Sequence, residues 1–329
     1  MSVPYVSIEN LNVTFTGGAR PVKAVNGVDL RVNRGEVAAL IGESGSGKSV
    51  TLRSILRLHN ERRTQITGGI KVGEQDVLKL SKTALENFRG KTAAMIFQEP
   101  LLALDPVYSV GAQIVESIRR HENISVGDAR KRALELFERV RIPSPDRRLD
   151  AYPHEMSGGM RQRAMIALAL SCKPQLLLAD EPTTALDATV QIQVLLLLRE
   201  LQREFGLSVI FVTHDIGAAV EVADRIAVMY AGRIVEEGPV NTLLRTPRHP
   251  YTKALLRSRA HGAMEKMDGQ RPRLETIAGA PPDLSLPQTG CAFAPRCTLA
   301  NDDCKQRQPE ASAISPGHSA RCLRLDATA

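Results

Sequence analysis

The chain has 329 residues, of which 43% are hydrophobic and 24% charged, and it carries a net charge of +7 with an isoelectric point near 9.3. This is ordinary globular composition, with room for one large domain or two smaller ones. Lys and Arg are dispersed without a run of five or more, Trp is absent and aromatic residues are few, which argues against a nucleic-acid-binding protein.

No apolar stretch approaches the roughly 18 residues that a membrane-spanning helix needs. The opening sequence MSVPYVSIEN lacks the basic region and apolar stretch of a signal peptide, so we expect a cytosolic protein. Four of the five cysteines follow residue 290, and since cytosolic thiols are normally reduced, no disulfide framework is expected.

Hydrophobic periodicity predicts an α/β protein. In chain order it indicates strands at 5–15, 28–32 and 36–41, a helix at 49–58, strands at 69–72 and 94–97, a helical stretch over 110–141, a helix at 158–171, a strand at 175–179, a helix at 188–205 and a strand at 208–213. Strands that alternate with helices favour a parallel sheet. A change in composition near Pro239, after which Pro, Arg and Cys are frequent, predicts a small appended domain.

Residues 42–49, GESGSGKS, fit the phosphate-binding P-loop pattern and lie between a predicted buried strand and a predicted helix. The backbone N–H groups of such a loop, and the start of the helix after it, point at the phosphates. We expect Lys48 to contact the β- and γ-phosphates and Ser49 to ligate Mg²⁺. The predicted nucleotide contacts of this segment are Gly42, Ser44, Gly45, Ser46, Gly47, Lys48, Ser49 and Val50.

A second phosphate-related pattern is an apolar strand that runs into two carboxylates, Asp180 and Glu181. Asp180 suits the coordination shell of Mg²⁺, and Glu181, one residue farther on, can polarise a water molecule beside the γ-phosphate. Together with the P-loop, this pattern predicts a nucleoside triphosphatase.

The order of the remaining motifs over residues 5–240 resembles the ATP-binding subunit of ABC transporters. The matching segments are Gln98 in IFQEP for the Q-loop, MSGGM at 156–160 for the LSGGQ signature, TALD at 184–187 for the D-loop, and His214 in VTHD for the switch histidine. Met156 and Met160 replace the outer Leu and Gln of the signature, while its three central residues are intact.

The resemblance implies a P-loop NTPase fold with a RecA-like core sheet, an antiparallel β subdomain and a helical subdomain at about residues 100–165. It divides the chain into a nucleotide-binding domain at 1–240 and a C-terminal extension at 241–329. Two such domains dimerise head to tail with two nucleotides between them. ATP held by the partner's P-loop would then be contacted by Ser157, Gly158 and Gly159.

The resemblance also implies roles for single residues. Hydrolysis would use Glu181 to orient water, His214 to contact the γ-phosphate and Lys48 to stabilise charge. Phe15 stands where the family places an aromatic ring against adenine, and Asp187 belongs to the D-loop. The ligands of Mg²⁺ would be Ser49, Gln98 and Asp180.

The four late cysteines, Cys291, Cys297, Cys304 and Cys322, are separated by gaps of five, six and seventeen residues. Structural zinc sites prefer tight C-x₂₋₄-C pairs, which are absent, whereas iron–sulfur ligation tolerates wider spacing. This segment, with HPYT at 249–252, resembles the C-terminal extension of oligopeptide and dipeptide importer ATPases, in which four cysteines can hold a [4Fe-4S] cluster. Four free thiols are the alternative, and Cys172 is simplest as a core residue.

The expected function is ATP hydrolysis that powers uptake of peptides, at the cytoplasmic face of the membrane. The implied partners are a second, different ATPase subunit that forms a heterodimer with this chain, two permease subunits and an extracytoplasmic solute-binding protein. Nickel, glutathione or another small solute could replace the peptide. A soluble ABC-type ATPase is a less favoured alternative, since the chain has one cassette and no long coiled-coil insertion. A GTPase or small-molecule kinase would lack the SGG loop, and no Asn-Lys-x-Asp occurs.

Overall fold

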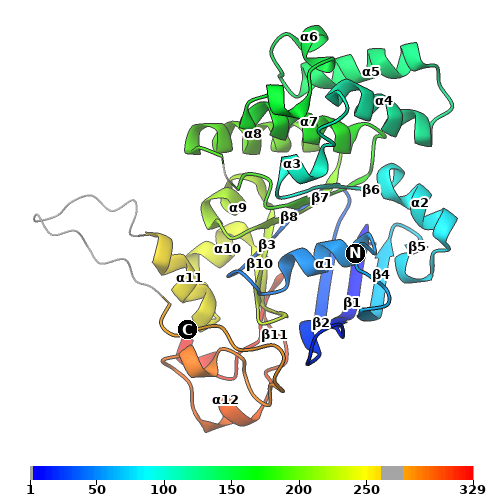
Figure 1. Ribbon diagram of the computed structural model, residues 1–329. Helices are drawn as coiled ribbons and strands as arrows, with labels where there is room; N and C mark the ends of the chain where they lie inside the picture. Colours follow the sequence, from blue (N-terminus) through cyan, green and yellow to red (C-terminus); the bar gives the residue numbers. More distant parts are fainter. Residues whose placement is uncertain (1–2, 185, 261–276, 329) are drawn as a thin grey trace, which may run out of the picture. The chain divides into compact units, whose positions relative to one another are not determined.

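The computed structural model describes residues 3–184, 186–260 and 277–328. None of the helices in these ranges combines the length and apolar character that a membrane crossing needs. The chain forms two compact units (Figure 1). The first unit contains Arg31–Val37 and Lys71–Thr213, with the few residues up to Val6; the second contains Ser7–Leu30, Ala38–Ile70 and the chain from His214 onward.

The first unit is built on three parallel strands in the order β8-β7-β6. These strands are β6 (Ala93–Ile96), β7 (Leu176–Asp180) and β8 (Ser208–Thr213), and every residue in them is buried. Such uninterrupted burial explains their nearly continuous apolar sequences, because helices cover both faces of a parallel sheet. The short β5 (Gln75–Asp76) pairs antiparallel with Lys71 and Val72 at the end of β4 (Thr64–Val72).

Helices make up the rest of the first unit, and α4, α5, α6 and α7 pack on one another (Figure 1). Their bounds are α2 (Lys82–Lys91), α3 (Pro100–Ala103), α4 (Val110–His121), α5 (Val126–Arg139), α6 (Pro145–Leu149), α7 (Gly158–Leu170) and α8 (Ala188–Phe205), with 3-10 turns at Val77–Lys79 and Pro153–Glu155. The helical stretch predicted over 110–141 is two helices. Ser125 begins the second one, since its hydroxyl accepts a hydrogen bond from the N–H of Asp128 at 3.1 Å.

The second unit contains two sets of strands. One has the order β2-β1-β4, formed by β1 (Val6–Phe15), β2 (Val22–Val32) and β4 (Thr64–Val72). The predicted strands at 28–32 and 69–72 are therefore only the ends of longer ones, because Gly27 and the pair Gly68-Gly69 interrupt the apolar pattern.

The other set has the order β11-β12-β10-β9-β3. Its members are β3 (Val37–Ile41), β9 (Arg225–Tyr230), β10 (Arg233–Pro239), β11 (Ser312–Ser315) and β12 (His318–Ala320). β3 and β9 are parallel, and the remaining pairs are antiparallel. The late strand β12 pairs with β10 through Glu236 opposite Ala320, so the segment after Pro239 adds two strands to this sheet.

Helices of the second unit are short. They are α1 (Lys48–Ile55), α9 (Ile216–Val222), α10 (Val240–Arg245), α11 (Pro250–Ala260) and α12 (Asp302–Gln306), with 3-10 turns at Ala294–Arg296 and Asp326–Thr328. The helix predicted at 49–58 ends at Ile55, and Arg57 follows in the left-handed region with φ 49°. A non-glycine residue in that region does not continue a right-handed helix.

Candidate functional site

The P-loop of the second unit joins the fully buried strand β3 to α1. Gly47 precedes α1 with φ 101°, and a Cβ at this position would lie 2.4 Å from the carbonyl oxygen of Ala24. Both the backbone conformation and the close approach therefore require glycine. The loop leads directly into the start of α1, whose first amide groups lack helical partners and are suited to bind an anion.

Two side chains of the P-loop point into the loop itself. The ammonium group of Lys48 donates hydrogen bonds to the carbonyl oxygens of Gly42 and Glu43, at 2.8 and 2.9 Å. The hydroxyl of Ser46 is buried and has no hydrogen-bond partner among the described residues. A buried polar atom of this kind is suited to a phosphate oxygen.

Phe15 is connected to α1 through a residue that the sequence pattern did not single out. Its ring meets His59 edge-to-face, with centroids 5.5 Å apart, and Nε2 of His59 donates to the carbonyl oxygen of Val50 at 3.1 Å. Burial lowers the pKa of His59, which favours the neutral form of the ring. No local signal marks His59, because its contacts are with residues brought near by the fold.

The two carboxylates predicted for the first unit end β7. Asp180 is fully buried, and Glu181 follows with φ 47°, a strained conformation for a side chain of this size. The N–H of Glu181 donates to the carbonyl oxygen of Val212 at 2.9 Å. Its Oε2 lies 3.0 Å from the hydroxyl of Thr184 and 3.5 Å from Nε2 of Gln98. These contacts hold the carboxylate of Glu181 in a defined position instead of leaving it in a solvated turn.

The signature segment begins α7. The hydroxyl of Ser157 accepts a hydrogen bond from the N–H of Met160 at 3.3 Å, so Gly158 and Gly159 form the first turn, where amide groups lack helical partners. A Cβ on Gly159 would lie 2.9 Å from Cγ1 of Val190 on α8. Close packing between the two helices is therefore one reason for glycine here.

The D-loop and the switch histidine also stand at helix starts. Asp187 caps α8, its Oδ1 accepting from the N–H of Val190 at 3.0 Å. Ala185 of the D-loop lies outside the described residues. His214 directly follows β8 and is exposed, and Asp215 after it caps α9.

The predicted site residues are thus divided between the units. The first unit holds Gln98, Ser157, Gly158, Gly159, Asp180, Glu181 and Asp187, and the second holds Phe15, the residues Gly42 to Val50, and His214. Within each unit the residues gather at the ends of buried strands and the starts of the helices after them. This is the usual location of a ligand site in an α/β protein.

Comparisons with known proteins place these motifs in a family. Residues 25–184 match the family model described as ABC transporter, and residues 235–304 match that of the oligopeptide/dipeptide transporter C-terminal region. The chain is 48% identical, over 98% of its length and 97% of the relative's, to a putative peptide import ATP-binding protein of Brucella abortus. A probable peptide ABC transporter ATP-binding protein of Sinorhizobium fredii is 46% identical over 97% of this chain and 94% of the relative.

The chain belongs to the ATP-binding proteins of ABC transporters. As such it is an ATPase subunit, and the expected P-loop fold is confirmed by solved structures. A dimeric ATP-binding cassette in a post-hydrolysis state, bound to ADP and Pi, is 30% identical with a TM-score of 0.64, covering 71% of this chain and 98% of that one. A cassette from Clostridium perfringens, part of an ABC transporter complex, has a TM-score of 0.63 at 26% identity, over 75% of this chain and 97% of that one.

The four late cysteines of this ABC ATPase are all free thiols in the second unit. Burial, reinforced by the neighbouring thiols, raises the pKa of Cys291 to about 11 and also raises the pKa of Cys297 and Cys322. In the described part of the chain, no group of three or more His, Cys, Asp or Glu side chains is arranged to hold a metal ion. The arrangement of the side chains therefore does not support the expected [4Fe-4S] cluster.

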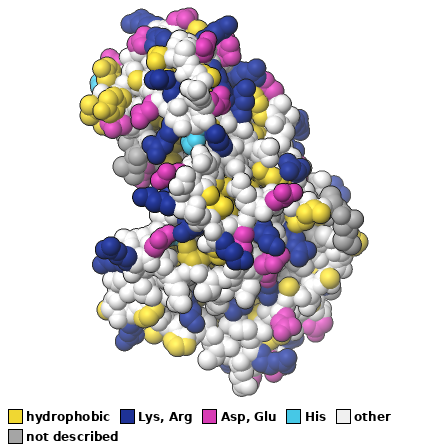
Figure 2. All heavy atoms as spheres, turned by 90° about the vertical axis from the view of Figure 1, so that its right-hand side faces the viewer, with side chains coloured by type: hydrophobic (Ala, Val, Ile, Leu, Met, Phe, Trp, Pro, Cys, Tyr) yellow, Lys and Arg dark blue, Asp and Glu magenta, His cyan; other side chains and the backbone are white. Residues whose placement is uncertain are grey.

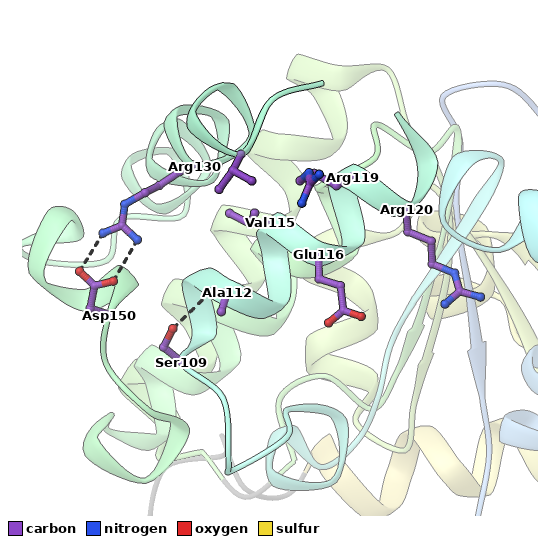
Figure 3. Close-up of a pocket in the computed structure, with 9 residues that line it drawn as sticks. Ser109, Ala112, Val115, Glu116, Arg119, Arg120, Arg130 and Asp150 are labelled. Carbon is purple, nitrogen blue, oxygen red and sulfur yellow. Dashed lines mark hydrogen bonds and ion pairs between the residues drawn. The ribbon is translucent and has the colours of Figure 1, made fainter. Parts of the chain in front are cut away.

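The surface formed by α4, α5 and Asp150 after α6 carries a cavity of about 710 Å³ (Figure 3). Figure 3 shows that α4 forms one wall and that Arg130 of α5 reaches Asp150 through two hydrogen bonds of 2.9 and 2.7 Å. Val107 and Tyr108, which precede the lining residue Ser109 in the chain, are 72% and 58% exposed. On the face shown in Figure 2, Lys and Arg are dispersed and mixed with Asp and Glu.

Proposed function

We propose that this chain is the ATP-hydrolysing subunit of an importer that takes up peptides. The observation that carries the proposal is similarity over almost the whole chain to proteins named for peptide import, together with the C-terminal match at residues 235–304. Nickel, glutathione or another small solute remains the alternative cargo, because an ATPase subunit of this kind does not contact the solute.

The proposed reaction is in-line attack of water on the γ-phosphate of ATP at a head-to-tail dimer, which breaks the bond from the γ-phosphorus to the bridging oxygen and releases ADP and phosphate. Glu181 accepts a proton and orients the water, for which its strained backbone and its contact with Thr184 fix the carboxylate. Lys48 and the amides at the start of α1 stabilise the transferred charge. His214 contacts the γ-phosphate, and Phe15 stacks against adenine.

Magnesium would be held by Ser49, Gln98 and Asp180, whose oxygen atoms are the ligands that this ion prefers. When bound, it would neutralise charge on the β- and γ-phosphates. The signature residues Ser157, Gly158 and Gly159 would serve the partner's ATP, since their amides open α7 and are not needed within the helix. Asp187 would complete the same interface as the cap of α8.

The proposed domain boundaries are those of the sequence: a nucleotide-binding domain at 1–240, which includes the helical subdomain at about 100–165, and an extension at 241–329. The helical subdomain would meet the membrane partner, which consists of two permease subunits, at the cytoplasmic face of the membrane. The adjacent exposed residues Val107 and Tyr108, just before α4, favour this surface, because exposed apolar side chains that lie together can mark an interaction site. A second ATPase subunit and an extracytoplasmic solute-binding protein would complete the importer.

The cysteines would serve as thiolate ligands of an iron–sulfur cluster, namely Cys291, Cys297, Cys304 and Cys322. Cysteine sulfur is the ligand type that such a cluster takes, and backbone N–H groups already reach the sulfur atoms of three of the four, including that of Arg324 at 3.3 Å from Sγ of Cys322. The described side chains do not yet form one metal-binding group, so cluster binding would require them to rearrange. Iron analysis of protein purified without oxygen tests this idea. Substitution of Cys291 by Ser should remove the iron, whereas Cys172→Ser should not.

The proposed function is tested by purifying the tagged protein from detergent-solubilised membranes and identifying the accompanying proteins by mass spectrometry. We expect two multi-span permeases and a second ATPase, and we expect Tyr108→Asp to lose the permeases while Leu286→Asn, another exposed apolar position, keeps them. The ligand of the solute-binding protein encoded nearby then identifies the cargo. Recovery of ribosomes alone, or a non-peptide ligand, would overturn the transport or the peptide assignment respectively.

A further inference from the structure

An ion pair joins the C-terminal extension to the P-loop within the second unit. The guanidinium of Arg296 donates to both carboxylate oxygens of Glu43, at 2.7 and 3.0 Å. The side chain of Arg296 is 4% exposed and that of Glu43 is 26% exposed. Glu43 is the second residue of the GESGSGKS loop, and a bidentate pair of this geometry is among the strong ones in proteins.

Arg296 is held in place by the extension and by Tyr230 of β9. Its guanidinium also donates to the carbonyl oxygens of Ile277 and Ala278, at 3.1 and 2.9 Å. Its Nη1 lies 3.2 Å from the hydroxyl of Tyr230. These contacts use the remaining donors of the guanidinium, so the charge is fixed opposite Glu43 before any nucleotide arrives.

A second residue of the extension reaches the same position of the loop. The N–H of Glu43 donates to the hydroxyl of Tyr251 on α11 at 2.9 Å. The ring of Tyr251 packs against those of Tyr230 and Phe293, with centroids 4.6 and 5.3 Å away. Since the carbonyl oxygen of Glu43 accepts from Lys48, the amide, carbonyl and carboxylate of this one residue are all held.

The chemistry of the loop explains why a cation is needed there. A phosphate-binding loop carries ATP, which is highly anionic, and an unpaired carboxylate in that loop would repel it. Arg296 neutralises the carboxylate, and the hydrogen bond to Tyr251 fixes the backbone that Lys48 uses. A loop that is already in its binding conformation loses less entropy when the ligand binds.

We propose that Arg296 and Tyr251 are positioning residues of the ATP site, and that the C-terminal extension is therefore part of the nucleotide site of its own chain. Neither residue needs to touch ATP. Arg296 acts by neutralising Glu43, and Tyr251 acts by holding the backbone of the loop. This role depends only on the binding of ATP by the chain and not on the identity of the transported solute.

The test is nucleotide affinity, measured on the full-length chain with a fluorescent ATP analogue, together with separate values of KM and kcat. Arg296→Gln should raise Kd and KM for the nucleotide about tenfold and leave kcat within about twofold, because a positioning contact acts mainly on binding. Arg296→Lys, which keeps the charge without the bidentate geometry, should lie between this variant and the wild type.

Two further variants separate charge neutralisation from a general loss of structure. The double variant Glu43→Gln with Arg296→Gln removes both charges and should recover most of the affinity. Arg321→Gln removes another Arg–carboxylate pair of the extension, with Asp29 at 3.3 Å, and should leave Kd unchanged. Wild-type affinity in Arg296→Gln, or no recovery in the double variant, would overturn the proposal.

Discussion

Glu236 on β10 and His318 on β12 form a buried pair, with Nε2 of His318 donating to Oε1 of Glu236 at 2.8 Å and side chains that are 0% and 2% exposed, respectively. The same carboxylate accepts from the backbone N–H groups of Arg248 and His249, at 2.7 and 2.8 Å. One side chain of the cassette sheet therefore holds both the start of α11 and the last strand of the extension.

Replacing Glu236 by Ala should lower the free energy of unfolding by about 3–5 kcal/mol, because three donors lose their acceptor in a buried place. Glu236→Gln should cost less, since it keeps one acceptor oxygen. The neighbour Glu237 is a matched control: it is partly exposed, lies 3.5 Å from Arg225, and its replacement by Gln should cost less than about 1 kcal/mol. Urea titration of all three variants measures the difference, and equal effects at 236 and 237 would contradict this role.

His249 should make the stability of the second unit depend on pH. Burial lowers the pKa of this imidazole from 6.5 to about 3, and its Nδ1 accepts a hydrogen bond from the N–H of Tyr251 at 3.0 Å. The unfolded chain binds a proton near pH 6.5 whereas the folded chain does not. The contribution of neutral His249 to the free energy of unfolding is therefore fully present above pH 6.5. It is lost as the pH falls towards 3, at about 1.4 kcal/mol per pH unit.

The check is to compare the wild type with His249→Asn, which cannot take up the proton, by urea unfolding at pH 7, 6 and 5. The wild type should be the more stable at pH 7, and its advantage should shrink as the pH is lowered. An advantage that stays constant over this range would show that His249 does not titrate with unfolding.

Local sequence patterns were enough to predict much of the fold. The strand at 208–213 and the helix at 188–205 are observed with those bounds, because continuous burial and the cap at Asp187 are written into neighbouring residues. The separation of α4 from α5 was not predicted. Apolar residues recur at helical spacing in both helices, and one polar residue, Ser125, marks the start of α5.

The candidate site shows more clearly that local sequence patterns do not predict contacts between distant residues. The residues of the P-loop and the carboxylates after β7 could be found from motifs, since each motif is a run of adjacent residues. The contact between Glu43 and Arg296 joins residues 253 positions apart, and no pattern in either segment indicates it. His59 was missed for the same reason, because its partners Phe15 and Val50 come near only in the folded chain.

Glu181→Gln should abolish ATP turnover and still permit ATP-bound dimers. Glutamine has the same shape and can accept from Thr184, but it cannot take a proton from water. We expect phosphate release to fall by a factor of about 10² or more, while light scattering shows a dimer that persists in ATP. Glu86→Gln, at an exposed position on α2, is the control and should change neither measurement. Normal turnover in Glu181→Gln would remove this residue from the mechanism.

Gly159 offers a way to distinguish packing from phosphate contact. A Cβ at this position would lie 2.9 Å from Cγ1 of Val190, so Gly159→Ala should displace the start of α7 and lower ATPase activity by about tenfold or more. Adding Val190→Ala removes the atom that is struck and should restore thermal stability. If the amides of the signature approach the partner's ATP closely, as we propose, the new methyl group still obstructs the nucleotide and activity stays low in the double variant. Val190→Ala alone is the control, and full recovery of ATPase activity in the double variant would show that Gly159 serves only helix packing.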